Sequence, residues 1–294
     1  MQITAIECIE GNHQRLDGGA MFGNAPKALW SRWVNADEYN RVTLACRALL
    51  VRLDDGRNIL FETGIGAFFD PMLKKRYGVI EEEHCLLDNL GKIGLTDNEI
   101  DIVILSHLHF DHAGGLVSAW EEGKSLKLLF PKAEFWTGEQ QWQRANNPHP
   151  RDRASYINEI NELLAKSGRL RLIKENGSHP LEALVEFSFS DGHTPGLMLS
   201  HIKTPAGIMV FCSDLIPGSA WVHVPICMGY DRYPELLSDE KKCLLNKLLR
   251  TKGYLFFTHD IELCIGKVHQ KENGRFYVTK QLAEEMINSP NHPD

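Results

Sequence analysis

Short apolar runs separated by turn residues alternate along the chain with longer stretches of helical spacing. Apolar runs of four to eight residues are typical of β-strands, whereas apolar residues three or four positions apart indicate helices. The runs predict strands over residues 3–10, 43–53, 58–62, 102–105, 185–190, 198–203, 208–212 and 254–258. The helical spacing predicts helices over residues 81–91, 154–167 and 234–250. This order favours an α/β fold in which two sheets are enclosed between helices.

One long segment near the beginning has no regular pattern. Residues 17–39 are rich in Gly, Trp and Phe and lie between the first two predicted strands. A connection of this length within a compact domain is usually functional or mobile. The sequence contains no internal repeat, low-complexity tract or Ser/Gly linker. We therefore expect a single domain over residues 1–294.

Composition and charge limit the classes of partner. The chain has 32 Lys and Arg against 39 Asp and Glu, which gives a net charge of −7 at pH 7. Because binding to nucleic-acid phosphates requires basic residues, we expect no nucleic-acid partner. Seven cysteines without a CxxC pair indicate a reducing compartment. With no secretory signal and no apolar run long enough to cross a membrane, we expect a cytoplasmic protein without membrane contacts.

The densest set of titratable residues follows the predicted strand over 102–105. It reads His107-Leu108-His109-Phe110-Asp111-His112. His107 and His109 are two positions apart, so in extended backbone they project to the same side. Four such side chains crowded at the end of a buried strand would repel or desolvate one another without a counter-ion. Since a chain of 294 residues can fold without a structural metal, the motif predicts a metal that takes part in chemistry.

Three residues further along the chain also come after predicted strands. His193 lies in the turn Gly192-His193-Thr194-Pro195-Gly196, and Asp214 and His259 come directly after apolar strands. Strand ends are where α/β sheets present their functional side chains. We therefore expect these three residues to join the first motif.

This combination of motifs resembles the signature of the metallo-β-lactamase superfamily. The residues that carry the resemblance are the HLHFDH run, the GHTPG turn and the strand-end Asp214 and His259. It extends from about residue 43 to residue 259 and implies an αββα four-layer sandwich. The function that it implies is metal-dependent hydrolysis.

The resemblance also implies two divalent metal ions per chain, held by seven side chains. One ion is bound by His107, His109 and His193, and the other by Asp111, His112 and His259, with Asp214 bridging both. We expect zinc, although iron, manganese and cobalt also accept His and Asp ligands. Glu62 stands where the superfamily usually has Asp, and we expect it to orient a ligand histidine unless it lies at the surface.

Two metals that share a water would generate hydroxide near neutral pH, which attacks a carbonyl or phosphorus centre. Asp111 is the nearest candidate for proton transfer to the leaving group, and Asp214 holds the two metals together. The better-known compact lactonases have a Tyr three residues after the bridging Asp, where this chain has Pro217. Tyr230, Tyr233 and His223 are candidates to replace that hydroxyl group, with Tyr230 taken as catalytic.

A second set of motifs concerns the substrate. The run Asp17–Gly23, Trp221 and the run Tyr230–Pro234 resemble quorum-quenching N-acyl homoserine lactonases of the YtnP type. The resemblance implies ring opening of a small apolar lactone or ester. The residues expected to contact it are Met21, Phe22, Trp30, Trp221, His223 and Tyr230, although each aromatic residue taken singly could instead pack beneath loops.

Three alternatives remain open at this stage. The same site could hydrolyse phosphotriesters or aryl esters, and the GHTPG turn would also suit a thioester hydrolase resembling glyoxalase II. A non-catalytic metal-binding protein is the third reading, although all seven ligand positions carry residues able to bind a metal. The sequence leaves the oligomeric state open, a homodimer included.

Overall fold

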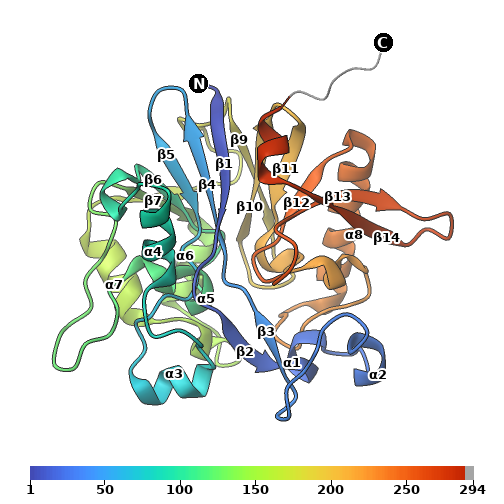
Figure 1. Ribbon diagram of the computed structural model, residues 1–294, viewed down its shortest axis with the longest axis horizontal. Helices are drawn as coiled ribbons and strands as arrows, with labels where there is room; N and C mark the ends of the chain where they lie inside the picture. Colours follow the sequence, from blue (N-terminus) through green and yellow to red (C-terminus); the bar gives the residue numbers. More distant parts are fainter. Residues whose placement is uncertain (289–294) are drawn as a thin grey trace.

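The computed structural model describes residues 1–288, and within this range two six-stranded sheets lie face to face (Figure 1). The first sheet has the strand order β1-β4-β5-β6-β7-β8. These strands are β1 Ile3–Ile9, β4 Ala48–Leu53, β5 Asn58–Phe61, β6 Ile102–Ile104, β7 Glu134–Gly138 and β8 Leu170–Ile173. The second sheet has the order β14-β13-β12-β11-β10-β9. Its strands are β9 Val185–Ser190, β10 Leu197–Thr204, β11 Gly207–Phe211, β12 Tyr254–Phe256, β13 Ile265–Gln270 and β14 Phe276–Gln281.

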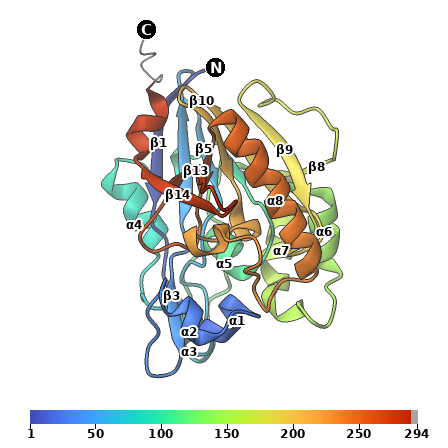
Figure 2. The same cartoon turned by 90° about the vertical axis from the view of Figure 1, so that its right-hand side faces the viewer.

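Helices cover the outer face of each sheet. Those beside the first sheet are α4 Cys85–Lys92, α6 Glu139–Asn146 and α7 Asn158–Lys166, whereas α5 Phe110–Ala113 lies at the end of the sandwich and α3 Pro71–Tyr77 lies below it (Figure 1). The second sheet is covered by α8 Pro234–Thr251, which runs along its outer face in Figure 2. A small sheet of β2 Gln14–Asp17 and β3 Arg41–Leu44 lies below the sandwich with α1 Gly18–Phe22 and α2 Lys27–Trp30 (Figure 1).

The alternation of side chains along single strands produces the layers. In β4, Leu49 packs in the core between the two sheets, whereas Leu50 packs in the core between the first sheet and its helices. In β12, Phe256 joins the core between the sheets, whereas Leu255 joins the core beneath α8. Because successive side chains in a strand point to opposite faces, each sheet contributes to two apolar layers. The predicted αββα four-layer sandwich is confirmed.

Strand directions bring the ends of several strands to one edge. β5 is parallel to β6, and β11 is parallel to β12. β9 and β11 are both antiparallel to β10, so these two strands run in the same direction. The loops that follow these strands therefore open at the same end of the sandwich, above the small sheet in Figure 1.

Three of the predicted elements have clearly different bounds in the structure, and the strands β2, β7, β8, β13 and β14 lie outside the predicted ones. The strand predicted over residues 43–53 is two strands, because the backbone of residues 45–47 leaves the sheet to pair with the turn after β12. Ala45 N donates to His259 O and Arg47 N donates to Thr258 O. The predicted helix over residues 154–167 begins only at Asn158, and the one over 81–91 begins at Cys85.

The irregular segment over residues 17–39 contains two short helices. Asp17 accepts a hydrogen bond from Ala20 N and thereby caps the first of them. Among the described residues, none of the helices is both long enough and apolar enough to cross a membrane. The single domain expected over residues 1–294 stays a prediction, and its last six residues lie outside the described part of the chain.

Candidate metal centre and active site

Polar side chains follow the strands that end at the open edge of the sandwich. They are Glu62 after β5, His107 after β6, His193 after β9, Asp214 after β11 and His259 after β12. The short helix α5, which comes soon after β6, adds His109 at its N-cap position and also Asp111 and His112. The first sheet and the second sheet therefore both contribute to one site.

The seven predicted ligand residues form two adjoining groups. Within each group the ligand atoms lie within 4.8 Å of one another: one group is His107, His109, His193 and Asp214, and the other is Asp111, His112 and His259. Asp214 faces both groups with different oxygens. Its Oδ2 atom lies 3.2 Å from His193 Nε2, and its Oδ1 atom lies 3.2 Å from His259 Nε2.

The atoms of these groups are suited to divalent metal ions. His107 is fully buried, and its Nδ1 atom lies 2.9 Å from Ser106 Oγ. Its Nε2 atom has no hydrogen-bond partner among the described residues. Since buried polar atoms normally have a partner, this nitrogen is positioned to bind a group other than protein. Imidazole nitrogens and carboxylate oxygens gathered at one place are typical of zinc and related metals.

The Glu62 carboxylate binds the Nδ1 side of the His112 ring. Its Oε2 atom lies 2.7 Å from His112 Nδ1, and both side chains are fully buried. The Glu62 Oε1 atom accepts hydrogen bonds from Ser106 and Ser213, which lie on loops from the two different sheets. A surface position for Glu62 is therefore wrong. The carboxylate fixes the ring so that Nε2 faces the other ligands, which is the usual role of such partners.

Asp231 does the same for His193, and sequence analysis assigned it no role. Its Oδ1 atom lies 2.8 Å from His193 Nδ1, while its Oδ2 atom accepts a hydrogen bond from Met228 N. A backbone carbonyl instead of a carboxylate holds His259, whose Nδ1 atom lies 2.6 Å from Ala45 O. Asp231 lies within the run Tyr230–Pro234, and this run is the sequence feature from which its role could have been inferred. The backbone N–H groups of the next two residues, Arg232 and Tyr233, donate to the carbonyls of His193 and Gly192.

Burial and charge set the protonation of the cluster. Burial lowers the pKa of His107 and His109 well below the usual value, so both rings are neutral, as metal ligands must be. Burial also opposes charge on His112, but Glu62, Asp214 and Asp111 outweigh it and raise the pKa of His112. Burial would raise the pKa of Asp214, yet the surrounding histidines hold it well below its usual range. The buried carboxylates thus create a negative field that favours cations.

A cavity of about 160 Å³ opens over this cluster. Its polar surface comes from His109, Asp111, His193, Asp214, His259 and Ser155. Its other lining residues, mostly apolar or aromatic, are Leu16, Met21, Leu44, Tyr77, Phe110, Ala154, Met228 and Tyr230. Tyr230 lies at its rim with 41% of its surface exposed, and burial together with the Asp111 charge raises its pKa.

Four residues expected to contact the substrate do not line this cavity. Phe22, Trp30 and Trp221 are buried and stacked, with Phe22 5.3 Å from Trp30 and 4.6 Å from Trp221 between ring centroids. Large flat rings are stabilised by packing against one another away from water, which explains the difference. Trp221 Nε1 donates to Met21 O, so the stack supports a cavity residue rather than the ligand itself. His223 is the fourth residue outside the cavity lining.

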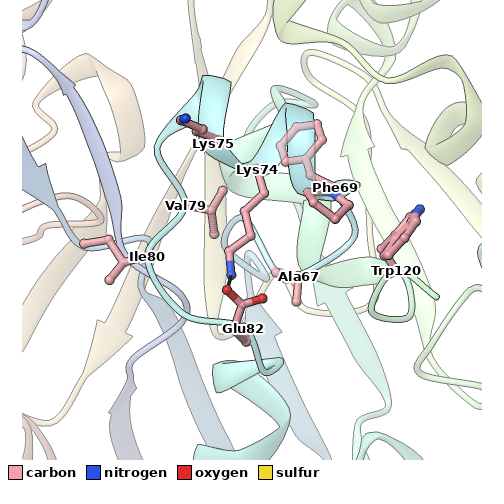
Figure 3. Close-up of a pocket in the computed structure, with 10 residues that line it drawn as sticks. Ala67, Phe69, Lys74, Lys75, Val79, Ile80, Glu82 and Trp120 are labelled. Carbon is pink, nitrogen blue, oxygen red and sulfur yellow. Dashed lines mark ion pairs between the residues drawn. The ribbon is translucent and has the colours of Figure 1, made fainter. Parts of the chain in front are cut away.

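A second, larger cavity of about 370 Å³ lies beside α3 (Figure 3). Its lining includes Trp120 and the ion pair between Lys74 and Glu82, and it contains none of the predicted ligand residues. Phe69 from this cavity stacks on Tyr77, with ring centroids 4.8 Å apart. Tyr77 belongs to the lining of the smaller cavity, so an aromatic layer lies between the two.

Sequence comparison finds a relative among the N-acyl homoserine lactonases. The chain is 24% identical over 185 residues to an N-acyl homoserine lactonase of Bacillus cereus, covering 62% of this chain and 64% of that protein. The chain thus matches less than two thirds of that relative's length.

Solved structures resemble a larger part of the chain. A probable metal-dependent hydrolase from Staphylococcus aureus has a TM-score of 0.82 and 26% identity, covering 96% of this chain and 100% of the other. AidC, a dizinc quorum-quenching lactonase in complex with its product, has a TM-score of 0.73 and 20% identity, covering 96% and 98%. At the identity of AidC the likeness concerns the fold alone.

The family assignment covers the strands that carry the site. Residues 41–259 match the metallo-beta-lactamase superfamily, a range that begins with β3 and ends at His259. All seven clustered His and Asp residues fall within it. This protein belongs to the metallo-beta-lactamase superfamily.

Proposed function

We propose that this protein is a dinuclear-metal hydrolase that opens the ring of an N-acyl homoserine lactone or a similar small lactone. The observation that carries the proposal is the position of Asp214, whose two oxygens face two separate groups of ligands beneath an apolar cavity. The Bacillus cereus relative, which is an N-acyl homoserine lactonase, supports the choice of substrate class. Removal of such lactones is quorum quenching.

The proposed metal ligands divide between the two groups. His107, His109 and His193 would hold one ion, and Asp111, His112 and His259 the other, with Asp214 between them. Zinc is the proposed metal, and iron, manganese or cobalt would fit the same ligands. Two such ions would supply an activated water and polarise the carbonyl group of the lactone.

The protein's own residues would orient the substrate and move protons. Asp111 is the least buried of the proposed ligands and lines the cavity, with 15% of its side chain exposed. Its carboxylate is thus placed to accept a proton from the attacking water and return it to the departing oxygen. The Tyr230 hydroxyl group at the rim would donate a hydrogen bond to the lactone, because its raised pKa keeps it protonated.

The apolar side of the cavity would accept the acyl chain. Met21, Phe110 and Met228 are among its apolar lining residues, and two carboxylates and three histidines are among its polar ones. An amphiphilic ligand with a polar ring and an apolar chain matches this division. The preferred chain length follows from how far the apolar wall extends from the cluster.

Two measurements on the purified protein test the proposal. Metal analysis should find two divalent ions per chain, and kcat/KM should be highest for acyl homoserine lactones in a panel with aryl esters, phosphotriesters and thioesters. Preference for one of the other substrates would replace the lactonase assignment while keeping the dinuclear hydrolase. Two bound metals without turnover of any substrate would favour a non-catalytic metal-binding protein.

A further inference from the structure

The five histidines of the cluster differ in how their rings are held. In four of them Nδ1 lies within hydrogen-bond distance of a group outside the seven proposed ligands: Ser106 Oγ for His107, Glu62 for His112, Asp231 for His193 and the Ala45 carbonyl for His259. His109 is the exception. Its Nδ1 atom lies 3.3 Å from His193 Nε2 and so faces the cluster, whereas its buried Nε2 atom has no hydrogen-bond partner among the described residues. The orientation of this ring therefore comes from something other than a hydrogen bond.

Tyr156 supplies a contact of another kind. Its ring packs against the His109 ring, with the centroids 4.8 Å apart and the planes inclined at 66°. The backbones of the same two residues form an isolated antiparallel β-bridge. The other rings that pack on His109 are those of the proposed ligands His107 and His193. Edge-to-face packing is a favoured arrangement of aromatic rings, so Tyr156 restricts the rotation of the His109 ring.

A buried hydrogen-bond network fixes Tyr156 in turn. Tyr156 is 5% exposed in the loop between α6 and α7, and its hydroxyl oxygen lies 2.9 Å from Thr194 Oγ1. The hydroxyl group also donates to Gln141 Oε1 over 3.2 Å. Gln141 of α6 and Thr194 are both fully buried. Since Thr194 directly follows His193, this tyrosine contacts His109 through its ring and the His193 turn through its hydroxyl group.

We propose that Tyr156 is a positioning residue for one of the two proposed metal ions, the one assigned to His107, His109 and His193. Its ring holds the His109 imidazole with Nδ1 facing the cluster, and its hydroxyl group keeps that ring in place against the His193 turn. The inference rests on the proposed dinuclear site. It adds to that site a residue that is neither a proposed ligand nor a side-chain hydrogen-bond partner of one.

Two substitutions separate the ring from the hydroxyl group. Tyr156→Leu removes the ring that packs on His109, whereas Tyr156→Phe keeps the ring and removes only the hydroxyl group. Loss of a group that orients a metal-binding histidine costs about 10–100-fold in metal affinity. Tyr156→Leu should therefore weaken one of the two sites by that factor and leave the other unchanged, because the Tyr156 ring packs on a ligand of one group alone. Tyr156→Phe should keep most of the affinity.

Two measurements on the full-length, metal-loaded protein read out this effect without any substrate. Competition with a coloured chelator resolves a tight and a weak zinc site, and the site weakened by Tyr156→Leu should be the one weakened by Asp231→Asn, since Asp231 holds His193 of the same group. The visible absorption bands of the Co²⁺-loaded protein report ligand geometry. Tyr156→Leu should shift these bands, and Tyr156→Phe should leave them close to those of the wild type.

Phe135→Leu is the matched control, because Phe135 of β7 is fully buried in the same apolar core as Tyr156. It should lower Tm as Tyr156→Leu does, but leave both metal affinities and the Co²⁺ bands unchanged. Equal losses of affinity in Tyr156→Leu and Phe135→Leu, or in Tyr156→Leu and Tyr156→Phe, would overturn the inference. Fewer than two ions in the wild type would refute the proposed dinuclear site itself, whereas two ions bound equally well by the wild type and Tyr156→Leu would refute only the role of Tyr156.

Discussion

Glu62 and Asp231 each hold one histidine of the cluster by its Nδ1 atom, His112 and His193 respectively. Both carboxylates are fully buried, and neither belongs to the seven proposed ligands. Their effect on metal binding is therefore transmitted through the ring that each one orients. At this scale the two residues provide a matched pair of tests for the proposed division into two metal sites.

Glu62→Gln should weaken metal binding at the His112 group, and Asp231→Asn should weaken it at the His193 group. Each substitution keeps the shape but removes the charge that orients the ring, and losses of such partners cost about 10–100-fold in metal affinity. Competition with a coloured chelator, resolved into a tight and a weak site, measures the effect. Each variant serves as the control for the other, and the same site weakened in both would contradict the division.

His201 gives a prediction for the dependence of stability on pH. It is 4% exposed in β10, and its Nε2 atom lies 2.7 Å from Ser188 Oγ. Burial lowers its pKa from 6.5 to about 4. The unfolded chain therefore binds a proton between these values that the folded chain does not, so stability falls as the pH falls from 6.5 to 4.

At pH 5 this term amounts to about 2 kcal/mol. His201→Gln should lose about that much less stability than the wild type between pH 7.5 and pH 5, as measured by urea unfolding. The metal ligands titrate in both proteins, so their contribution cancels in the comparison. Identical pH dependence in the two proteins would show that His201 is not held neutral in the folded state.

At the scale of elements, the loop between β11 and α8 supplies the cavity residues Met228 and Tyr230. Lys241 of α8 is fully buried and donates to the carbonyls of Trp221 and Ile226 at the two ends of a short segment of this loop. Gly229 N donates to Ala20 O of α1. The cavity residues Met21 and Met228 are therefore held by contacts with α8 and with the N-terminal segment.

This arrangement changes which residues should control acyl-chain preference. Each methylene buried against the cavity wall contributes up to about 0.8 kcal/mol, so kcat/KM should rise several-fold with each two-carbon extension of the acyl chain. Met228→Ala should flatten that rise and leave the metal content unchanged. A rate series over short, medium and long acyl homoserine lactones provides the measurement.

Trp30→Ala is the matched control for this series. Trp30 is 1% exposed and stacked on Phe22, so its loss should cost about 3–5 kcal/mol of stability through the cavity that it leaves. The chain-length dependence of the folded variant should persist. A flat series in Trp30→Ala together with an unchanged series in Met228→Ala would reverse our assignment of the cavity wall.

At the scale of the whole molecule, the cluster connects the two halves of the sandwich. His107, His109 and His112 follow a strand of the first sheet, whereas His193 and His259 follow strands of the second. A ligand that binds only the folded state stabilises it, by about 4 kcal/mol at a concentration 1,000 times its Kd. Bound metal ions should therefore hold the open edge of the sandwich together.

Chelation should consequently lower Tm by many degrees in the wild type. Asp214→Asn removes the negative charge between the two proposed sites, so this variant should bind less metal, lose activity by orders of magnitude and respond far less to chelator. Differential scanning calorimetry with and without chelator measures the response, and re-addition of zinc is the control for reversibility. Equal responses in the two proteins would show that Asp214 does not bridge the sites.

Several parts of the fold could be predicted from local pattern because burial on both faces leaves a continuous apolar run. β6, β10, β11 and β12 read in this way, and candidate ligands follow β6, β11 and β12. β13 and β14 were not predicted, because exposed faces near the sheet edge interrupt their apolar pattern with Lys and His residues. The break between β3 and β4 was also missed, since it depends on pairing with the turn after β12.

The family and the composition of the candidate metal cluster follow from the sequence, because each candidate ligand is adjacent to a strand or turn that the local pattern reveals. The positions of the aromatic residues and of Asp231 depend on contacts that form only in the folded chain. Trp30 and Trp221 stack in the core on either side of Phe22, and the Asp231 carboxylate lies against His193 Nδ1. These contacts join segments far apart in the chain, where the burial of one surface depends on another element. The periodicity of apolar residues within one segment does not indicate which distant segment it will contact.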